Sequence, residues 1–499
     1  MKKAALREVA VRSLGPFLTA ALLLASPARA GDTLWYSIAA ENGAAIGYSS
    51  EEIALGANGR EITDVQEIDL EEPGDPQPMA PWFTVRKQTR MVWRSVLRQD
   101  AAGHTVSISA TAAIGADVTR SEARIDGGKA VVTRQTSAET RNVTVALPQD
   151  VRFDSGDGLL ADWHPATTPR LAFDNFNIDA MAVEHVTVEV VPGAVPDTQG
   201  RIAVLRKRFD GSSLVAVARL LLDAKGRIVE VTQPMFGANI TVSASEQAAA
   251  LRPHAPYHML PHMMQKSPYR ISRPAMRGHI RYRFAFQGGI EFALPQTGEQ
   301  RVTAEPGFAT VDICDDCGPG LPNDAATLAD ALRPTAWLQS DAPSIREIAA
   351  PVAKLAVSDA RKMEILSRKT KPYLGRLDFN GVYSALETLT RHAGDCTEAA
   401  ALLAALGRAA GIPTRVANGL VYSRESYHGV SNAFMPHSWV LAYVDGKWRS
   451  YDAALDIFDS THIALTVGDG DARSVVAANQ LAGLLRWDAM AEVRARPAN

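Results

Sequence analysis

Apolar and polar residues alternate in short runs through the first half of the chain. The run from Ser121 to Thr136 shows the pattern, with small apolar and charged residues alternating around the turn Asp126-Gly127-Gly128. The same pattern recurs around Asp223-Ala224-Lys225-Gly226, and further turn pairs occur at Asn58-Gly59 and Asp210-Gly211. An alternation of period two buries one face of a strand, and glycine-containing turns join antiparallel neighbours. We therefore predict an antiparallel β domain over residues 31–250.

Prolines interrupt this rhythm over residues 251–277, which also carry His254, His258 and His262. Histidines four residues apart on a helix would share one face and could bind a metal ion. Pro256 and Pro261 fall between them and oppose a helix. We therefore favour a proline-stiffened linker over a His/Met metal site, and we predict no metal in the protein.

Strand-like alternation returns over residues 278–320, and helical spacing follows. Apolar residues then recur at three- and four-residue spacing, which is typical of amphipathic helices. The predicted helices are Ala325 to Leu332, Ile345 to Leu355, Asp359 to Thr370, Val382 to His392, and a run from Cys396 to Ala410. We predict an α+β fold: a second β segment at 278–320, a mixed domain at 321–470 and a C-terminal segment at 471–499.

The first thirty residues have the pattern of an export signal. Lys2, Lys3 and Arg7 precede a short apolar stretch, and Ala28-Arg29-Ala30 is typical of a cleavage site. No later window offers about 18 uninterrupted apolar residues, so no transmembrane segment is expected after signal removal. We expect a periplasmic protein, with secretion as the alternative.

Length and charge limit the classes of partner. A chain of 499 residues usually forms two or three domains. Its formal net charge of −3 comes with no basic stretch, so we expect no nucleic-acid partner and no cationic membrane surface.

The chain has three cysteines, an odd number for an exported protein. Cys314 and Cys317 stand in a Cys-Asp-Asp-Cys run, which could form a disulfide, half of a zinc site or a redox dithiol. An oxidising compartment favours the disulfide, and no second ligand pair completes a zinc site. Cys396 is then left as a free thiol.

Cys396 stands in the first turn of a predicted helix. Unpaired N–H groups and the helix dipole can lower the pKa of a thiol there and bind a developing oxyanion. The alternative is that Cys396 is a small buried apolar residue, as many cysteines are.

A hairpin after this helix carries the groups that a thiol nucleophile needs. If the two-residue turn Asp445-Gly446 pairs Val444 with Lys447, His437 and Asp452 become diagonal neighbours on one face. Such a pair can act as a base and its orienting carboxylate. The alternatives are an edge histidine and a carboxylate that caps a strand end. The other histidines of this region are His392, His428 and His462.

Three further residues are candidates for the walls of a substrate cleft. Trp439 and Trp448 lie near the pair, although packing in the core is our preferred interpretation for both. His428 stands in a loop rich in Gly, Ser and Asn that could border a cleft.

Taken in order, these motifs resemble the transglutaminase-like superfamily. The matching stretches are Arg391 to Glu398, Leu402-Leu403, Arg408 to Arg415, Gly419 to Tyr422, His437-Ser438-Trp439, Trp448 and Asp452. The resemblance covers about residues 340–470 and implies a papain-like fold with a triad of Cys396, His437 and Asp452. Ala453-Ala454 stands where such sequences commonly have Pro-Thr. Trp337, Tyr383 and Thr390 precede the cysteine, but no spacing identifies one as a second oxyanion donor.

From these features we expect an exported thiol enzyme without a cofactor, acting on amide or peptide bonds of a peptide or protein through a thioester. Hydrolysis is favoured over crosslinking because water is the abundant acceptor. The alternative is a non-catalytic periplasmic binding or assembly protein that keeps the fold. In either case the β domain could dock a partner.

Overall fold

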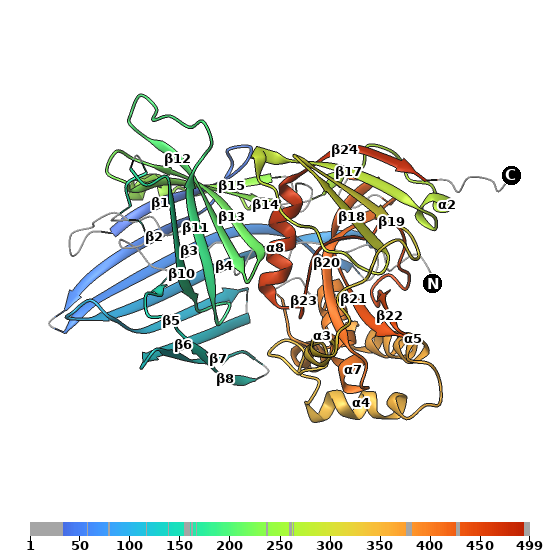
Figure 1. Ribbon diagram of the computed structural model, residues 1–499. Coiled ribbons are helices and arrows are strands. Elements are labelled where there is room, and N and C mark those ends of the chain that lie inside the picture. Colours follow the sequence, from blue (N-terminus) through green and yellow to red (C-terminus); the bar gives the residue numbers. More distant parts are fainter. Residues whose placement is uncertain are drawn as a thin grey trace. The chain divides into compact units, whose positions relative to one another are not determined.

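The computed structural model describes residues 33–493 apart from 57, 78–79, 116, 138, 154–159, 161–162, 166, 236–237, 259–261, 263, 376–381 and 426–429. The predicted export signal lies outside the described residues. The chain divides into an N-terminal unit that ends at Met259 and a C-terminal unit that runs from Leu260 to Asn499. The division lies inside the stretch 251–277 that we predicted to be a linker. The described chain is β-rich (Figure 1).

The N-terminal unit is built on one sheet of fifteen strands. In chain order these are β1 (Thr33–Ala40), β2 (Ala45–Gly56), β3 (Gly59–Gln77), β4 (Ala80–Asp100), β5 (Thr105–Ile114), β6 (Asp117–Asp126), β7 (Lys129–Gln135), β8 (Thr140–Ala146), β9 (Arg152–Phe153), β10 (Arg170–Asn177), β11 (Ala182–Val190), β12 (Ile202–Asp210), β13 (Ser213–Leu222), β14 (Ile228–Met235) and β15 (Ala238–Ser245). Consecutive strands form two meanders, β1–β8 and β9–β15, and pairing of β1 with β15 joins them. The pairs are antiparallel except β9 with β10.

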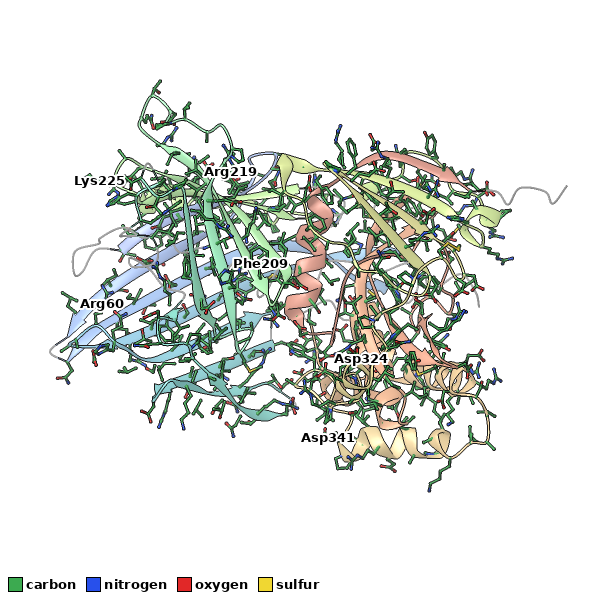
Figure 2. All side chains as sticks on the ribbon, viewed as in Figure 1. Arg60, Phe209, Arg219, Lys225, Asp324 and Asp341 are labelled. Atoms are coloured by element: carbon green, nitrogen blue, oxygen red, sulfur yellow. A yellow bond between two sulfur atoms is a disulfide. The ribbon has the colours of Figure 1, made fainter. Side chains whose placement is uncertain are left out.

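The predicted hairpins are present in this unit. Asp126 pairs with Lys129 across Gly127 and Gly128, which both have positive φ as a tight hairpin turn requires. On β13, Arg219 is exposed between two buried neighbours, which is the alternation that predicted the strand (Figure 2). A one-turn helix, α1 (Gln247–Ala250), follows the last strand.

The C-terminal unit contains two smaller sheets. One has the order β18-β19-β17-β24 and consists of β17 (Ile280–Phe286), β18 (Gln300–Glu305), β19 (Phe308–Ile313) and β24 (Leu485–Glu492). The other has the order β16-β21-β20-β23, with β22 also paired to β21, and consists of β16 (Gln265–Lys266), β20 (Thr414–Ser423), β21 (Ala433–Val444), β22 (Lys447–Tyr451) and β23 (Ile463–Gly468). The C-terminal segment thus completes the sheet that begins at Ile280, because β24 pairs with β17.

Most helices of this unit lie between β19 and β20 in the sequence. They are α2 (Arg273–Met276), α3 (Ala325–Asp330), α4 (Pro343–Ala353), α5 (Asp359–Thr370), α6 (Ala385–Arg391), α7 (Cys396–Ala409) and α8 (Ala472–Gly483), with 3-10 turns at Gln287–Gly289 and Lys371–Leu374. Asp324 caps α3 by accepting from the N–H groups of Ala326 and Thr327 (Figure 2). Among the described helices, none combines the length and apolar character that a membrane span requires.

Several helix boundaries differ from the predictions, and the helix predicted from Ile345 to Leu355 runs from Pro343 to Ala353. The helix predicted from Val382 begins at Ala385, because Ser384 and Glu387 form a capping box that satisfies the first N–H groups. The helix predicted to end at Leu332 ends at Asp330. The stretch predicted as a linker contributes β16 and α2 to the C-terminal unit.

Helix α7 is the central element of the C-terminal unit. It packs against β20 and β21 and is surrounded by α4, α5 and α6. Nearly all of its residues are buried, in agreement with its run of alanine and leucine. Small side chains allow close approach on every side of the helix, so its first residue is held rigidly at one end of the sheet.

Candidate active site

Cys396 is the first residue of α7. Asp395 caps the helix by accepting from the N–H of Thr397, and the N–H of Asp395 donates to Glu398 Oε2 at 2.8 Å. The capping box therefore fixes the backbone on both sides of the thiol. The bonds to the cap do not include the N–H of Cys396, which belongs to the free end of the helix.

The thiol itself is buried, with 4% of Cys396 exposed. It lies in an apolar cluster with Met264, Val421, Ala433 and Met435. Burial raises the pKa of the Cys396 thiol well above its ordinary value, the nearby Asp395 carboxylate raises it further, and the N–H of Ser438 offsets this only in part. Desolvation and the neighbouring carboxylates thus act against the lowering that a helix N-terminus can give a thiol.

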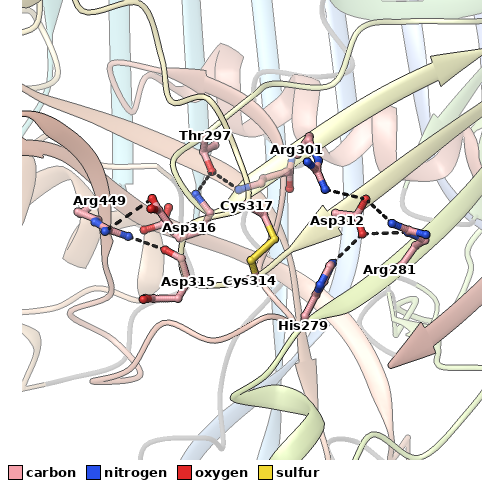
Figure 3. The surroundings of a disulfide bond; sticks show 12 residues. His279, Arg281, Thr297, Arg301, Asp312, Cys314, Asp315, Asp316, Cys317 and Arg449 are labelled. Atoms are coloured by element: carbon pink, nitrogen blue, oxygen red, sulfur yellow. Dashed lines mark hydrogen bonds and ion pairs between the residues drawn. A yellow bond between two sulfur atoms is a disulfide. The ribbon is translucent and has the colours of Figure 1, made fainter. Parts of the chain in front are cut away.

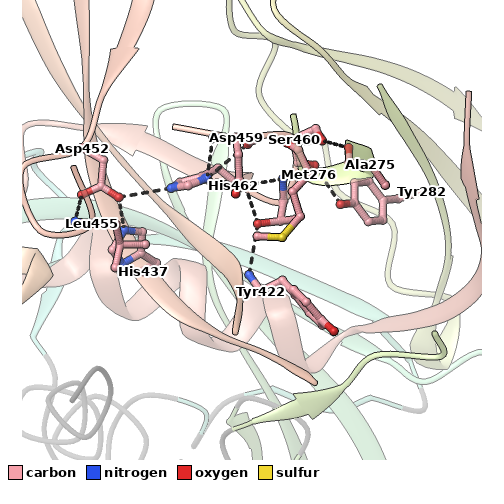
Figure 4. A network of polar contacts seen from close by, with 11 residues as sticks. Ala275, Met276, Tyr282, Tyr422, His437, Asp452, Leu455, Asp459, Ser460 and His462 are labelled. Atoms are coloured by element: carbon pink, nitrogen blue, oxygen red, sulfur yellow. Dashed lines mark hydrogen bonds and ion pairs between the residues drawn. The ribbon is translucent and has the colours of Figure 1, made fainter. Parts of the chain in front are cut away.

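The hairpin of β21 and β22 has the predicted register. Val444 pairs with Lys447, and the turn residues Asp445 and Gly446 both have positive φ. The ladder ends at Val440 and Tyr451, one pair before Asp452. His437 Nε2 lies 2.7 Å from Asp452 Oδ2, and both side chains are buried (Figure 4).

The carboxylate of Asp452 is held from both sides. Its Oδ1 accepts from the N–H groups of Ala454 at 2.8 Å and Leu455 at 2.9 Å. Burial would raise the pKa of this carboxyl, but the hydrogen bonds from His437 and His462 hold it well below the usual range. Asp452 is thus ionised at neutral pH. Ala453-Ala454 still allows the loop to close on the carboxylate, although Pro-Thr was expected there.

His437 keeps its second ring nitrogen available. Nδ1 is buried and has no hydrogen-bond partner among the described residues. Ala433, Met435 and His437 alternate along β21, so a regular strand directs them to the same side, where Ala433 and Met435 already pack with Cys396. The N–H of Ser438, the next residue, also lowers the pKa of the Cys396 thiol. The thiol therefore lies beside the strand position that carries the imidazole.

His462 is a site residue that our sequence analysis named only as another histidine of the region. Its Nε2 lies 3.2 Å from the same Asp452 Oδ2 that binds His437 (Figure 4). The residue stands just before β23, a strand that pairs with β20 and not with the hairpin of His437. Its place could be found only from the order of strands in the sheet, since no local spacing connects it to Asp452.

The cleft candidates have different positions. Trp439 and Trp448 are buried in one cluster, as their core interpretation predicted. The Trp439 ring stacks 6.1 Å from that of His437, whereas Trp448 donates through Nε1 to the Pro322 carbonyl. His428 lies outside the described residues.

Three further residues that precede Cys396 have other partners. His392 is exposed at the end of α6 with its ring against Tyr373. Thr390 donates its hydroxyl to the Leu386 carbonyl and is exposed. Tyr383 is buried, and its N–H donates to Glu398.

Cys314 and Cys317 are joined by a disulfide in the structure, and Cys396 is a free cysteine (Figure 3). The loop of the disulfide contacts β22. Lys447 Nζ donates to Asp316 Oδ2 at 2.8 Å, and Arg449 donates to the Asp315 carbonyl at 2.5 Å (Figure 3 shows Arg449). The disulfide thus closes a loop that supports the strand leading to Asp452.

Among the described residues, two groups of side chains have metal-ligand atoms close together. His279 lies near Cys314 and Cys317, but the two sulfurs are bonded to each other and offer no thiolate. The second group consists of His437, His462 and Asp452. Here Nε2 of each histidine is already hydrogen-bonded to Asp452 Oδ2. A metal there would have to replace these hydrogen bonds.

A family comparison agrees with the motifs. Residues 346–453 match the model of the transglutaminase-like superfamily, which confirms the resemblance for this stretch. The matched residues include Cys396, His437 and Asp452. No curated protein matches the chain.

Several solved structures are similar to parts of the chain. A beta-barrel-like protein from a domain family of unknown function in Brucella abortus is 16% identical, with 43% of this chain and 95% of that one covered and a TM-score of 0.32. A candidate cysteine protease from Cytophaga hutchinsonii is 16% identical, with 43% and 86% covered and a TM-score of 0.27. The periplasmic domain of TgpA from Pseudomonas aeruginosa, bound to ethylmercury, is 15% identical, with 45% and 83% covered and a TM-score of 0.27.

Proposed function

Because residues 346–453 belong to the transglutaminase-like superfamily, we propose that the chain is an exported thiol enzyme of papain-like fold that acts on amide or peptide bonds. Cys396 is the nucleophile, His437 is the base and Asp452 orients the imidazole. The observation that carries the proposal is the 2.7 Å contact between His437 and Asp452, which leaves Nδ1 as the nitrogen available to a thiol.

The neutral thiol is the resting form in this proposal, because burial and the carboxylate of Asp395 raise the pKa of Cys396. His437 Nδ1 takes the proton as sulfur attacks the carbonyl carbon, and the new imidazolium is stabilised by Asp452. The oxyanion that forms is stabilised by the N–H of Cys396 at the N-terminus of α7.

The intermediate then collapses. The carbon–nitrogen bond breaks, the amine leaves with the proton held by His437, and the acyl group remains on Cys396 as a thioester. Water, deprotonated by His437, releases the acid and restores the thiol. We favour hydrolysis over crosslinking because no amine-binding site is evident beside His437 among the described residues, while water is abundant. The substrate is a peptide or protein, and the N-terminal sheet could dock it.

Digestion of an unfolded protein tests the reaction. The full chain without its first thirty residues is incubated with reduced, alkylated albumin and a fluorescent primary amine. New peptide termini that disappear in Cys396→Ala support hydrolysis. Amine incorporation without new termini would instead assign acyl transfer.

One observation favours a second candidate function, a binding or assembly protein that keeps the fold. The thiol is only 4% exposed, so an acyl group cannot reach sulfur without local movement. If wild type and Cys396→Ala give no cleavage and no amine transfer, and wild type is not alkylated at Cys396, the second candidate is favoured.

We also propose a periplasmic location, or secretion as the alternative. The pattern of residues 1–30 and the disulfide between Cys314 and Cys317 support it. Fractionation of cells that express the full chain tests the location, and a cytoplasmic product with its N-terminus intact would contradict it.

A further inference from the structure

We propose that His462 is a positioning residue for this site, which holds the Asp452 carboxylate in place for His437 by binding Asp452 and Asp459 at once. The inference rests on the proposed function, because it assigns a role to a residue that acts on the nucleophile through Asp452. His462 lies beyond the stretch that matches the superfamily, which ends at residue 453.

Both nitrogens of the His462 ring face carboxylate or carbonyl oxygens. Nε2 lies 3.2 Å from Asp452 Oδ2, and Nδ1 lies 3.1 Å from the Asp459 carbonyl and 3.3 Å from Asp459 Oδ1. A neutral imidazole could donate to only one side, whereas an imidazolium donates to both. When Nδ1 carries no proton, it can accept from the N–H of Asp459, which lies 3.3 Å away. In either protonation state the ring therefore binds Asp452 through Nε2 and Asp459 through Nδ1.

Asp459, the second residue that His462 binds, is itself held in place. Asp459 Oδ1 accepts from the N–H of Thr461 at 2.9 Å and from its hydroxyl at 2.6 Å (Figure 4 shows Asp459). Ser460 is held by its hydroxyl, which lies 2.9 Å from the Ala275 carbonyl. The turn before β23 thus cannot shift without breaking several hydrogen bonds. His462 is 1% exposed and hydrogen-bonds both Asp459 in this turn and Asp452, so the turn fixes the position of Asp452.

The Asp452 carboxylate is consequently held at both oxygens. Backbone N–H groups of Ala454 and Leu455 bind Oδ1, while His437 and His462 share Oδ2. Rotation of the carboxylate would break bonds on each side. Loss of His462 would leave His437 as the only partner of Oδ2 among the described residues, and the imidazole and carboxylate could then turn together.

Charge gives His462 a second effect on Asp452. Asp452, Asp459 and His437 are the titratable groups that face the His462 ring among the described residues. Tyr282 lies near Asp459. The rings of Trp439 and Phe458 pack against the His462 ring. Two buried carboxylates without a balancing charge would repel each other and favour protonation. Burial alone would lower the pKa of His462, but the bonds to Asp452 and Asp459 raise it to about 9. The ring therefore keeps Asp452 ionised.

The pH dependence of Cys396 alkylation tests this role. Iodoacetamide is added to the folded chain from pH 5 to pH 10, and modification of Cys396, the free cysteine, is followed by mass spectrometry. In His462→Gln we expect the rate at pH 7 to fall about tenfold, because the carboxylate that orients His437 is less firmly held. We expect the pH of half-maximal rate to rise by about one unit, because the site loses a positive charge that favours the thiolate. Asp459→Asn changes the second residue that His462 binds and is expected to shift the profile in the same direction.

Two comparisons make the result decisive. His392→Gln changes an exposed histidine of the same unit and keeps the wild-type profile. If His437→Gln slows alkylation and His462→Gln retains the wild-type profile, the role of His462 is wrong and the proposed function stands. If His437→Gln has no effect either, the proposed function fails. Should His462→Gln unfold, as judged by circular dichroism, Asp459→Asn decides, and a wild-type profile in that variant overturns the proposal.

Discussion

The side chains of His437 and Asp452 meet at 2.7 Å because a two-residue turn folds β22 back along β21. The turn brings the two residues close although they are 15 positions apart. Both are buried, so water does not compete for their hydrogen bond. The base and its orienting carboxylate are therefore built by one hairpin, and α7 supplies the thiol.

Asp452→Asn tests the orienting group. An amide can accept from the backbone but carries no charge to stabilise an imidazolium, so alkylation of Cys396 at pH 7 should slow by at least about a hundredfold. The rate is measured with iodoacetamide on folded protein. Asp456→Asn, an exposed carboxylate that pairs with Lys371, is the matched control and should react as wild type does. Equal rates for Asp452→Asn and wild type would exclude an orienting role.

Met264 packs in the apolar cluster around Cys396. We expect Met264→Ala to raise the alkylation rate of Cys396 severalfold, because a smaller side chain opens space beside sulfur. Loss of a buried Met side chain should also cost roughly 2 to 5 kcal/mol of folding free energy.

Met363→Ala provides the control for stability. Met363 is fully buried in the cluster around α4, α5 and α7, apart from the cluster of Cys396. Its truncation should destabilise to a similar degree without faster alkylation. An equal acceleration in both variants would mean that general loosening, and not access beside Met264, controls the rate.

Local patterns predicted more of this site than of its surroundings. The turn Asp445-Gly446 specified the register of the hairpin, and glycine-containing turns specified the hairpins of the N-terminal sheet. Both are relations between residues close in sequence. His462 reaches Asp452 through the pairing of β23 with β20, which depends on the order of strands.

The pKa of Cys396 shows a second limit. A helix N-terminus is visible in the sequence, but the depth of burial and the position of Asp395 relative to the sulfur are not. Both effects raise the pKa of the thiol and oppose the lowering that a helix N-terminus can give. The pairing of β24 with β17 was likewise not predicted, since most of the C-terminal unit lies between these two strands in the sequence.

The disulfide should stabilise the C-terminal unit modestly. Closing so short a loop restricts the unfolded chain by about 2 kcal/mol. The double variant Cys314→Ser with Cys317→Ser should lose about that amount in urea unfolding, followed by near-ultraviolet circular dichroism. Mass spectrometry of the exported protein without reductant should find these two cysteines bonded. Two free thiols there would contradict the prediction.

The charge of His462 makes stability depend on alkaline pH. Its folded pKa of about 9 exceeds the ordinary value of 6.5, so its contribution is complete below pH 6.5 and is lost as pH rises through 9. The loss is at most about 3 kcal/mol. The free energy of unfolding in urea should fall more between pH 6.5 and pH 9.5 for wild type than for His462→Gln. The same difference in both proteins would show that other groups cause it.

The central claim is that His437 activates Cys396. Its most direct test is the rate at which iodoacetamide modifies Cys396 in the folded chain at pH 7, compared between wild type, His437→Gln and the control His392→Gln. We expect wild type and His392→Gln to react at one rate and His437→Gln at least about a hundredfold more slowly. Equal rates in all three proteins, or a wild-type thiol that reacts only after unfolding in urea, would contradict the account.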